Sequence, residues 1–348
     1  MTNTEQLIQT IPSQTEELDR KKDHIELAFQ SQTNGHEKNT GLNYEPILSG
    51  HPEADLEPMS FLGKTMNAPL WISSMTGGTE IAQHINHNLA KVCGEFGLGM
   101  GLGSCRKLLE DDRYFDDFNL RPIIGYDHPF FANLGIAQIE ESLAQNKLAD
   151  IIEMINRLEA DGLIIHVNPL QEWLQPEGDK ITQPPIDTIK AFLDKVNFKV
   201  IVKEVGQGMG PKSLKALFEL PLAAVDFAAF GGTNFSKLEL LRGDEQNLHL
   251  YSQLAAIGHS ADEMTRFTNE ILNDLGDKAL CKQVIISGGI QSFLEGYQLI
   301  NKINCTSVYG QGSAFLKHAQ GSYDELQFFV STQIKGLQLA NALLEVKK

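Results

Sequence analysis

The sequence predicts a (β/α)8 barrel, in which eight parallel strands form a closed ring surrounded by helices. Short apolar runs alternate with helical patterns along most of the 348 residues. Strands that are apolar throughout are typical of parallel sheets with helices on both faces. Eight such runs are present, and this number favours a closed barrel over an open doubly wound sheet. Several runs end in glycine or a small polar residue, where such barrels carry their functional groups.

The expected strands are short and rich in apolar residues. In chain order they are PLWISSM (69–75), GLGMGLGS (97–104), FFANLG (130–135), GLIIHVN (162–168), KVIVKEVG (199–206), AAVDFAAFGG (223–232), QVIISGG (283–289) and TSVYGQGS (306–313).

Helical patterns with apolar spacing near 3.6 lie between the strands. One predicted helix, in residues 138–162, has one side lined by Leu148, Ile151, Ile152, Ile155 and Leu158. In a second, in residues 210–220, Pro211 suits the first helical position. Its buried stripe is expected to contain Leu214, Leu217 and Phe218.

Two segments lie outside this alternation. Residues 1–60 precede the first strand and are expected to form an N-terminal extension, whereas residues 61–348 form the barrel. About fifty residues separate the sixth and seventh strands, and an excursion of this length is usually functional or disordered.

Composition excludes several classes of protein. A formal net charge of −16 argues against a nucleic-acid binder, which must neutralise phosphates. No run of eighteen apolar residues is present, so no membrane span is expected. The polar N-terminus lacks the apolar core of a signal peptide. The four cysteines show no CxxC spacing and are expected to be reduced thiols of a cytoplasmic protein.

The stretch HVNPLQE places four polar residues after the fourth strand. His166 and Asn168 follow Ile164 at a spacing of two, so all three are expected on one face of the strand. Gln171 and Glu172 follow in the loop over the barrel mouth. For any one of them, a histidine that caps the core or a solvated carboxylate remains an equal alternative. Together they point to a ligand, because burial without one would leave donors and acceptors unpaired at about 1–3 kcal/mol each.

The last two strands end in VIISGGI (284–290) and VYGQGSAF (308–315). Glycines at these positions let backbone amides approach a phosphate, and phosphate binding after strands seven and eight recurs in this barrel. Lys203, in a strand covered on both faces, would be costly to bury without an anion or a polarised acceptor such as a flavin edge. Pairing of Lys203 with Glu204 or another carboxylate is the alternative.

Small polar groups end four further strands, in SSMTGG (73–78), GSCR (103–106), NLG (133–135) and GGTNF (231–235). Asn133 and Thr233 could bond a flavin ring, although turn chemistry explains each motif equally well. Arg20, Lys21 and His24 form a basic cluster in RKKDHI. A solvated patch on a leading helix is one interpretation, and a phosphate-binding cluster, with Arg106 as a further cation, is the other.

In these motifs the sequence resembles the type 2 isopentenyl diphosphate isomerases, which are FMN-dependent (β/α)8-barrel enzymes. The motifs are RKxxH (20–24), MTGG (75–78), HxNxxQE (166–172), KEVGxGM (203–209) and GGT (231–233), and they span nearly the whole chain in family order. RKxxH together with HxNxxQE is a narrow signature, whereas SGG and NLG occur widely in flavin barrels.

The resemblance implies a role for each matching residue. The extension would contribute diphosphate-binding residues, and the diphosphate would be held by Arg20, Lys21, His24 and Arg106. Glu172 would bind Mg²⁺, which bridges to the diphosphate, while the substrate pocket would be lined by His166, Asn168 and Gln171. FMN would be contacted by Ser74, Met75, Thr76, Ser104, Asn133, Lys203 and Thr233, with its phosphate near Gly288, Gly289, Gln291, Gly312 and Ser313.

The resemblance also implies the reaction. Isopentenyl diphosphate would be converted to dimethylallyl diphosphate with no net redox change, reduced FMN performing the proton transfers and NADPH serving only to reduce the flavin. Mg²⁺ suits a site with one carboxylate and substrate phosphates. A homo-oligomer, a tetramer or an octamer, is the usual assembly of the family.

Two other functions remain open from the sequence. One is an FMN-dependent oxidoreductase on the same barrel that acts on a small carboxylate substrate. The other is a phosphate-ligand sensor that has kept the barrel, although a sensor has no need of a metal-binding carboxylate beside a flavin.

Overall fold

The computed structural model describes residues 14–347 and divides into two compact units, residues 1–42 and 43–348. Within the described part of the first unit lie helix α1 (Gln14–Leu27) and a 3₁₀ turn, η1 (Gly35–Glu37). Two short strands, β1 (Leu42–Tyr44) and β12 (Leu344–Val346), form a two-stranded sheet. No described helix combines the length and the apolar character that a membrane span requires.

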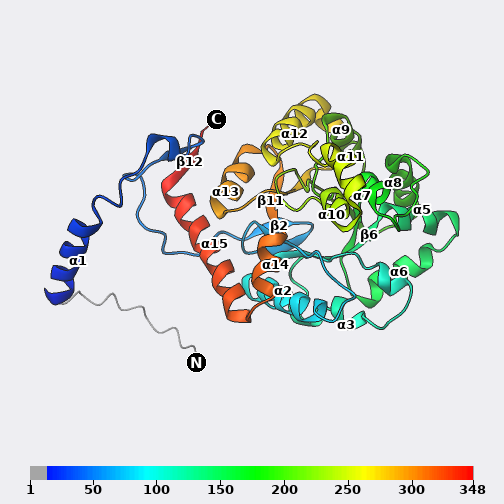
Figure 1. The fold of residues 1–348 in the computed structure, drawn as a ribbon, viewed down its shortest axis with the longest axis horizontal. Helices are drawn as coiled ribbons and strands as arrows, with labels where there is room; N and C mark the ends of the chain where they lie inside the picture. The colour runs from blue at the N-terminus through cyan, green and yellow to red at the C-terminus, as the bar shows by residue number, and fades with distance from the viewer. Residues whose placement is uncertain (1–13, 348) are drawn as a thin grey trace. The chain divides into compact units, whose positions relative to one another are not determined.

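The second unit contains a closed barrel of eight parallel strands, as the sequence predicts (Figure 1). The ring follows chain order and closes where β11 pairs with β4, with Gly310 beside Trp71. Its strands are β4 (Leu70–Ser73), β5 (Gly99–Gly101), β6 (Phe130–Gly135), β7 (Gly162–His166), β8 (Lys199–Lys203), β9 (Ala224–Asp226), β10 (Gln283–Ser287) and β11 (Thr306–Gln311). All eight fall inside the predicted runs.

Helices surround the barrel strands (Figure 1). They are α2 (Ala82–Phe96), α3 (Phe115–Phe118), α4 (Arg121–Ile124), α5 (Ile136–Ala144), α6 (Leu148–Arg157), α7 (Pro169–Leu174), α8 (Pro185–Leu193), α9 (Pro211–Phe218), α10 (Phe235–Arg242), α11 (Glu245–Ala255), α12 (Ala261–Leu275), α13 (Phe293–Lys302), α14 (Ser313–Ala319) and α15 (Tyr323–Leu343), with 3₁₀ turns η2 (Arg106–Leu109) and η3 (Gly276–Lys278). The long segment between the sixth and seventh barrel strands is helical, because α10, α11 and α12 occupy it.

The predicted helices are partly corrected. Residues 138–162 contain two helices, α5 and α6, because the chain turns at Asn146, whose φ is +55°. Ile151 and Ile155 are buried as expected, but Ile152 is 38% exposed, because Met154 occupies the buried face in its place. Helix α9 begins at Pro211 and buries its predicted stripe.

Side chains fill the barrel interior. Trp71 of β4 packs against Phe131 of β6 and lies in one apolar cluster with residues of the other strands. Strand β5 makes room for the indole ring, since a Cβ on Gly99 would lie 2.4 Å from a Trp71 ring carbon. Dense apolar packing of this kind excludes a ligand from the centre of the barrel.

An antiparallel hairpin that the sequence analysis did not predict packs against this cluster. Strands β2 (Met59–Phe61) and β3 (Lys64–Met66) are joined by Leu62 and Gly63, both with positive φ. Such a two-residue turn matches the twist of the strands. The side chains of Phe61, Leu62 and Met66 are buried in the barrel cluster.

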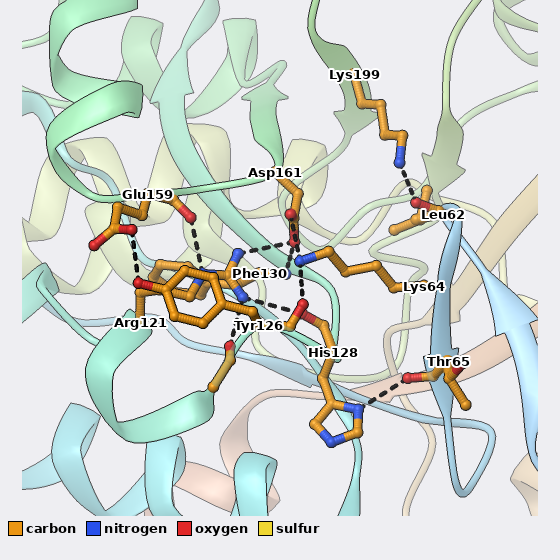
Figure 2. A network of polar contacts seen from close by, with 11 residues as sticks. Leu62, Lys64, Thr65, Arg121, Tyr126, His128, Phe130, Glu159, Asp161 and Lys199 are labelled. Carbon is orange, nitrogen blue, oxygen red and sulfur yellow. Dashed lines mark hydrogen bonds and ion pairs between the residues drawn. The ribbon is translucent and has the colours of Figure 1, made fainter.

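Polar contacts attach the hairpin to the amino ends of the barrel strands (Figure 2). Lys199, the first residue of β8, donates to the carbonyl oxygen of Leu62, and Lys64 Nζ lies 2.7 Å from Asp161 Oδ1, just before β7. His128 Nδ1 lies 2.9 Å from the carbonyl oxygen of Thr65. This end of the barrel is therefore closed.

Arg121 organises the same end (Figure 2). Its guanidinium is fully buried and donates to the carbonyl oxygens of Glu159, Gly125 and His128 at 2.8, 2.9 and 3.1 Å. Its Nη2 lies 2.9 Å from Asp161 Oδ2. The buried charge is thus paired, and each of its three guanidinium nitrogens donates at least one hydrogen bond, as burial of an arginine requires.

We expect Arg121→Met to lower the free energy of unfolding by about 3–5 kcal/mol, because it leaves three carbonyl oxygens and a partly buried carboxylate without their donor. Chemical denaturation measures this loss. The matched control is Arg266→Met, which removes an exposed pair with Glu270 and should cost less than about 1 kcal/mol. Equal losses in the two variants would contradict this role of Arg121.

Candidate active site

A cavity of about 260 Å³ lies at the carboxyl ends of the barrel strands, away from the hairpin. Most of the predicted site residues line it. They are Ser74, Met75, Ser104, Asn133, His166, Gln171, Lys203, Thr233, Gly288, Gly289, Gln291, Gly312 and Ser313. The strand ends of one barrel rim therefore bring residues that are up to 239 positions apart, from Ser74 to Ser313, to one cavity.

Other predicted residues lie elsewhere. Thr76, Asn168, Glu172 and Arg106 are outside the cavity lining. Arg20, Lys21 and His24 lie on α1, in the first unit, with exposed side chains.

The cavity also has lining residues that the sequence analysis did not single out. Ser73, Val205, Phe235, Ser287 and Gln311 belong to this group. Each lies inside or next to a quoted motif at the end of a strand. Their position at a strand end, and not their residue type, was therefore the feature of the sequence that could have identified them. Ser73 Oγ is buried and has no hydrogen-bond partner among the described atoms.

His166, the last residue of β7, is uncharged and donates a hydrogen bond to Asn133. Its Nδ1 lies 2.9 Å from Asn133 Oδ1. The side-chain nitrogen of Asn133, Nδ2, donates to the carbonyl oxygen of Leu102 at 2.8 Å. Since Asn133 therefore presents an acceptor, Nδ1 of His166 carries the proton and Nε2 is an acceptor. Burial, with a smaller contribution from the charge of Lys203, lowers the pKa of His166 to about 3.

Lys203 is the charged residue among those lining the cavity. In register it lies between His166 of β7 and Asp226 of β9. The alternative considered from the sequence was pairing with Glu204 or another carboxylate; Glu204 is not the partner, but Asp226 lies beside Lys203 in register. The Glu204 carboxylate instead accepts from the backbone amides of residues 206, 207 and 208 at 2.7, 2.6 and 2.8 Å.

Asp226 is the buried carboxylate beside Lys203. It is 1% exposed and accepts a hydrogen bond from Ser287 Oγ. Burial raises the pKa of Asp226, while the charge of Lys203 and the Ser287 hydrogen bond oppose the shift. Lys203 thus lies beside an acidic group and lines the cavity, where its ammonium group can meet an acceptor on a ligand.

A polar network on the rim holds Glu172. Its Oε1 accepts from Asn168 Nδ2 at 2.8 Å, and its Oε2 accepts from the backbone amide of Asp179 at 2.7 Å. Asn168 Nδ2 also donates to Gln171 Oε1 at 3.1 Å, and Gln171 Nε2 lies 3.3 Å from Oε1 of the buried Glu239. The carboxylate next to the cavity is therefore oriented by two donors.

Arg106 belongs to the same rim. Its guanidinium lies 2.6 Å from Asp179 Oδ2, which also accepts from Gln138 Nε2 at 2.7 Å. Asp179 consequently links the two residues: the side chain of Asp179 binds Arg106, and the backbone amide of Asp179 donates to Glu172.

Two glycine-containing segments form one side of the cavity: residues 288–291, after β10, and residues 310–313, from the end of β11 to the start of α14. They are called the glycine loops below. Gly288 and Gly289 have positive φ, and a Cβ on Gly288 would lie 2.1 Å from backbone atoms of Ala229. A Cβ on Gly312 would lie 3.2 Å from the Met75 sulfur. Close packing against neighbouring loops thus requires glycine at these positions. The two segments line the cavity at the ends of adjacent strands, and this placement fits the phosphate of FMN.

The cavity also offers polar groups for the ring of a flavin. Lys203 and the unpartnered hydroxyl of Ser73 offer polar groups for a flavin. Among residues 14–347 no group of three or more metal-binding side chains occurs. A single carboxylate such as Glu172 fits Mg²⁺ only where the ion takes its remaining oxygen ligands from phosphates and water.

The structure resembles barrels of flavin enzymes. A mandelate oxidase variant with a monooxide FMN adduct matches with a TM-score of 0.53 and 10% identity over 88% of each chain. The flavin-binding domain of baker's yeast flavocytochrome b2 matches with a TM-score of 0.60 and 9% identity over 87% of this chain and 76% of that one. The chain is thus a (β/α)8 barrel with the fold of FMN-dependent enzymes.

Sequence relatives define the family more closely, although no family model matches. Isopentenyl-diphosphate delta-isomerase of Rickettsia peacockii (strain Rustic) is 32% identical over 330 residues, 92% of each chain. The enzyme of Rickettsia prowazekii (strain Madrid E) is 32% identical over 308 residues, 87% of this chain and 86% of that one. The chain belongs to the isopentenyl-diphosphate delta-isomerase family, which confirms the resemblance in its motifs.

We expect the His166 ring to remain uncharged between about pH 5 and pH 8. Its folded-state pKa of about 3 lies below the unfolded value of about 6.5, so its contribution to stability is complete above about pH 6.5 and declines as the pH falls towards 3. NMR titration of the ring resonances, assigned with His166→Asn, measures this. A midpoint near 6.5 would contradict the burial of this ring.

Proposed function

We propose that the protein interconverts isopentenyl diphosphate and dimethylallyl diphosphate by a 1,3-allylic proton shift that uses reduced FMN and Mg²⁺, with no net redox change. The observation that carries the proposal is the common cavity of Lys203, His166, Gln171 and the two glycine loops, with Glu172 next to it on the rim. Membership of the isomerase family supports the same reaction.

Reduced FMN, when bound, would supply the proton donor and acceptor for the shift. Lys203 would face the flavin ring with its charge balanced by Asp226, and the glycine loops would hold the phosphate. Neutral His166 would accept a hydrogen bond at Nε2 without adding charge beside the apolar part of the substrate. The FMN contacts would otherwise come from Ser74, Met75, Thr76, Ser104, Asn133 and Thr233.

Gln171 would lie close to the reacting carbons. Its amide is held at both ends, by Asn168 Nδ2 at its oxygen and by Glu239 at its nitrogen, so it has one orientation. A fixed amide positions an alkene better than a free one, because less conformational freedom is lost when the substrate binds.

The diphosphate would be bound at the rim. Arg106 and the basic cluster of Arg20, Lys21 and His24 would supply the cations, with residues 1–60 acting as the extension and 61–348 as the FMN-binding barrel. Glu172 would hold Mg²⁺, which would supply positive charge to the diphosphate. Arginine suits this task because its forked donors match phosphate oxygens.

NADPH would reduce the flavin without being consumed in step with product. The reaction, which has soluble diphosphate substrates, is consistent with the cytoplasm as the location of the protein. A homo-oligomer, a tetramer or an octamer, would be the assembly.

An FMN oxidoreductase with a small carboxylate substrate is less well supported. Such an enzyme needs a cation for the substrate in addition to groups that serve the flavin. Among the described residues that line the cavity, Lys203 is the one with a charge, and no arginine is present.

The experiment is an anaerobic incubation with FMN, a reductant, Mg²⁺ and isopentenyl diphosphate in heavy water. We expect deuterium in dimethylallyl diphosphate and no nicotinamide consumption in proportion to product. Absence of allylic product, or steady net oxidation of a substrate, would overturn the proposal.

We expect Glu172→Gln to reduce turnover at limiting Mg²⁺ by at least about a hundredfold while FMN stays bound, since the neutral amide is a poor Mg²⁺ ligand. Titration of initial rates with Mg²⁺, together with the flavin absorbance, measures both effects. Glu141→Gln, on the exposed side of α5, is the matched control. Unchanged Mg²⁺ dependence in Glu172→Gln would refute the metal assignment.

A further inference from the structure

A chain of buried polar side chains connects helix α15 with the two glycine loops. Gln333 of α15 is 4% exposed and its Nε2 donates to Oε1 of Gln311 at 2.9 Å. Gln311 is 3% exposed and its Nε2 donates to the carbonyl oxygen of Ile290 at 3.2 Å. At the other end the hydroxyl of Tyr309 lies 3.3 Å from Gln333 Oε1.

The direction of these hydrogen bonds is determined from one end. The carbonyl oxygen of Ile290 can only accept, so the amide nitrogen of Gln311 faces it and the amide oxygen faces Gln333. Gln333 must then donate with its nitrogen and accept from Tyr309 with its oxygen. Each member therefore has one orientation, and a side chain without an amide N–H at position 333 would leave Gln311 Oε1 unpaired.

These contacts cross between the glycine loops. Ile290 and Gln311 both line the cavity; Ile290 lies in the loop after β10, and Gln311 is the last residue of β11. The Gln311 side chain thus ties one loop to the other, and Gln333 holds Gln311 in the orientation that makes this tie.

Helix α15 is packed closely enough to make this contact. It lies against α13 and α14, the helices that follow the two loops. A Cβ on Gly336 would lie 2.6 Å from the Phe293 ring of α13, so glycine at this position permits the approach. A surface helix normally packs through apolar side chains, and the buried amide of Gln333 is tolerated there because Gln311 and Tyr309 hydrogen-bond both of its ends.

We propose that Gln333 is a positioning residue for cofactor binding: acting through Gln311, it sets the spacing of the two glycine loops that receive the phosphate of FMN. The proposal rests on the proposed function, since it requires FMN in the cavity. It assigns to α15, outside the barrel, control over the affinity for the phosphate end of the cofactor and not over the flavin ring.

The test compares FMN with riboflavin, which has the same ring and lacks the phosphate. Gln333→Met keeps the length of the side chain and removes the donor. Flavin-free protein is titrated with each compound by fluorescence quenching. We expect the Kd for FMN to rise at least about tenfold and the Kd for riboflavin to change by less than about twofold.

The matched control is Gln338→Met on the same helix, which removes a hydrogen bond from Nε2 to the Ala54 carbonyl oxygen and should leave both constants unchanged. Tyr309→Phe, which removes one hydroxyl, provides a milder variant if Gln333→Met does not fold. Tyr309→Phe should also reduce the preference for FMN over riboflavin, as Gln333→Met does. Thermal unfolding of the flavin-free variants separates a general loss of stability from the effect on the phosphate.

The outcomes distinguish this inference from the proposed function. Wild-type protein that binds no flavin would refute the proposed function. Wild-type protein that prefers FMN, with the preference intact in Gln333→Met or in folded Tyr309→Phe, would overturn the role of Gln333 alone. An equal loss of FMN and riboflavin affinity would also overturn it, because that result indicates a structural role without action on the phosphate.

Discussion

Trp71 occupies the barrel interior because β5 presents Gly99 and Gly101 to it in place of side chains. With Phe61 and Leu62 of the hairpin in the same cluster, the amino end of the barrel is filled by apolar groups. Polar side chains on the strands therefore have one end at which they can meet a ligand. The position of the cavity, and with it the juxtaposition of His166 and Lys203, depends on this packing.

Three buried or half-buried acidic side chains at the open end each have hydrogen-bond or charge partners. Asp226 has Lys203 and Ser287 beside it, Glu204 accepts from three backbone amides, and Glu239 pairs with Arg242 at 2.5 Å. Each carboxylate thereby avoids the cost of an unpaired buried charge. Lys203 remains directed at the cavity, which explains how an acidic protein can present a cation to an electron-rich ligand.

The sequence predicted the barrel and most of the cavity because both follow from short-range signals. Apolar runs identify strands, and the carboxyl ends of eight strands in a ring must meet at one rim. The hairpin β2–β3 was missed because each strand has three residues, too few for a periodic pattern. Gln333 was also missed, since its contact with Gln311 joins an outer helix to a strand end and no local pattern marks it. Similarly, the pairing of Arg106 with Asp179 depends on tertiary contacts 73 residues apart in the chain.

The ring closes through β4 and β11, the first and last barrel strands in the chain. During synthesis Trp71 leaves the ribosome well before its neighbour Gly310, and the hairpin leaves before Lys199 and Gln283, which bind its turn. Strand β5 covers one edge of β4 early, but the other edge has no native partner until β11 emerges. The nascent chain consequently carries an unprotected sheet edge for most of its translation, the period in which a chaperone has the most to contribute.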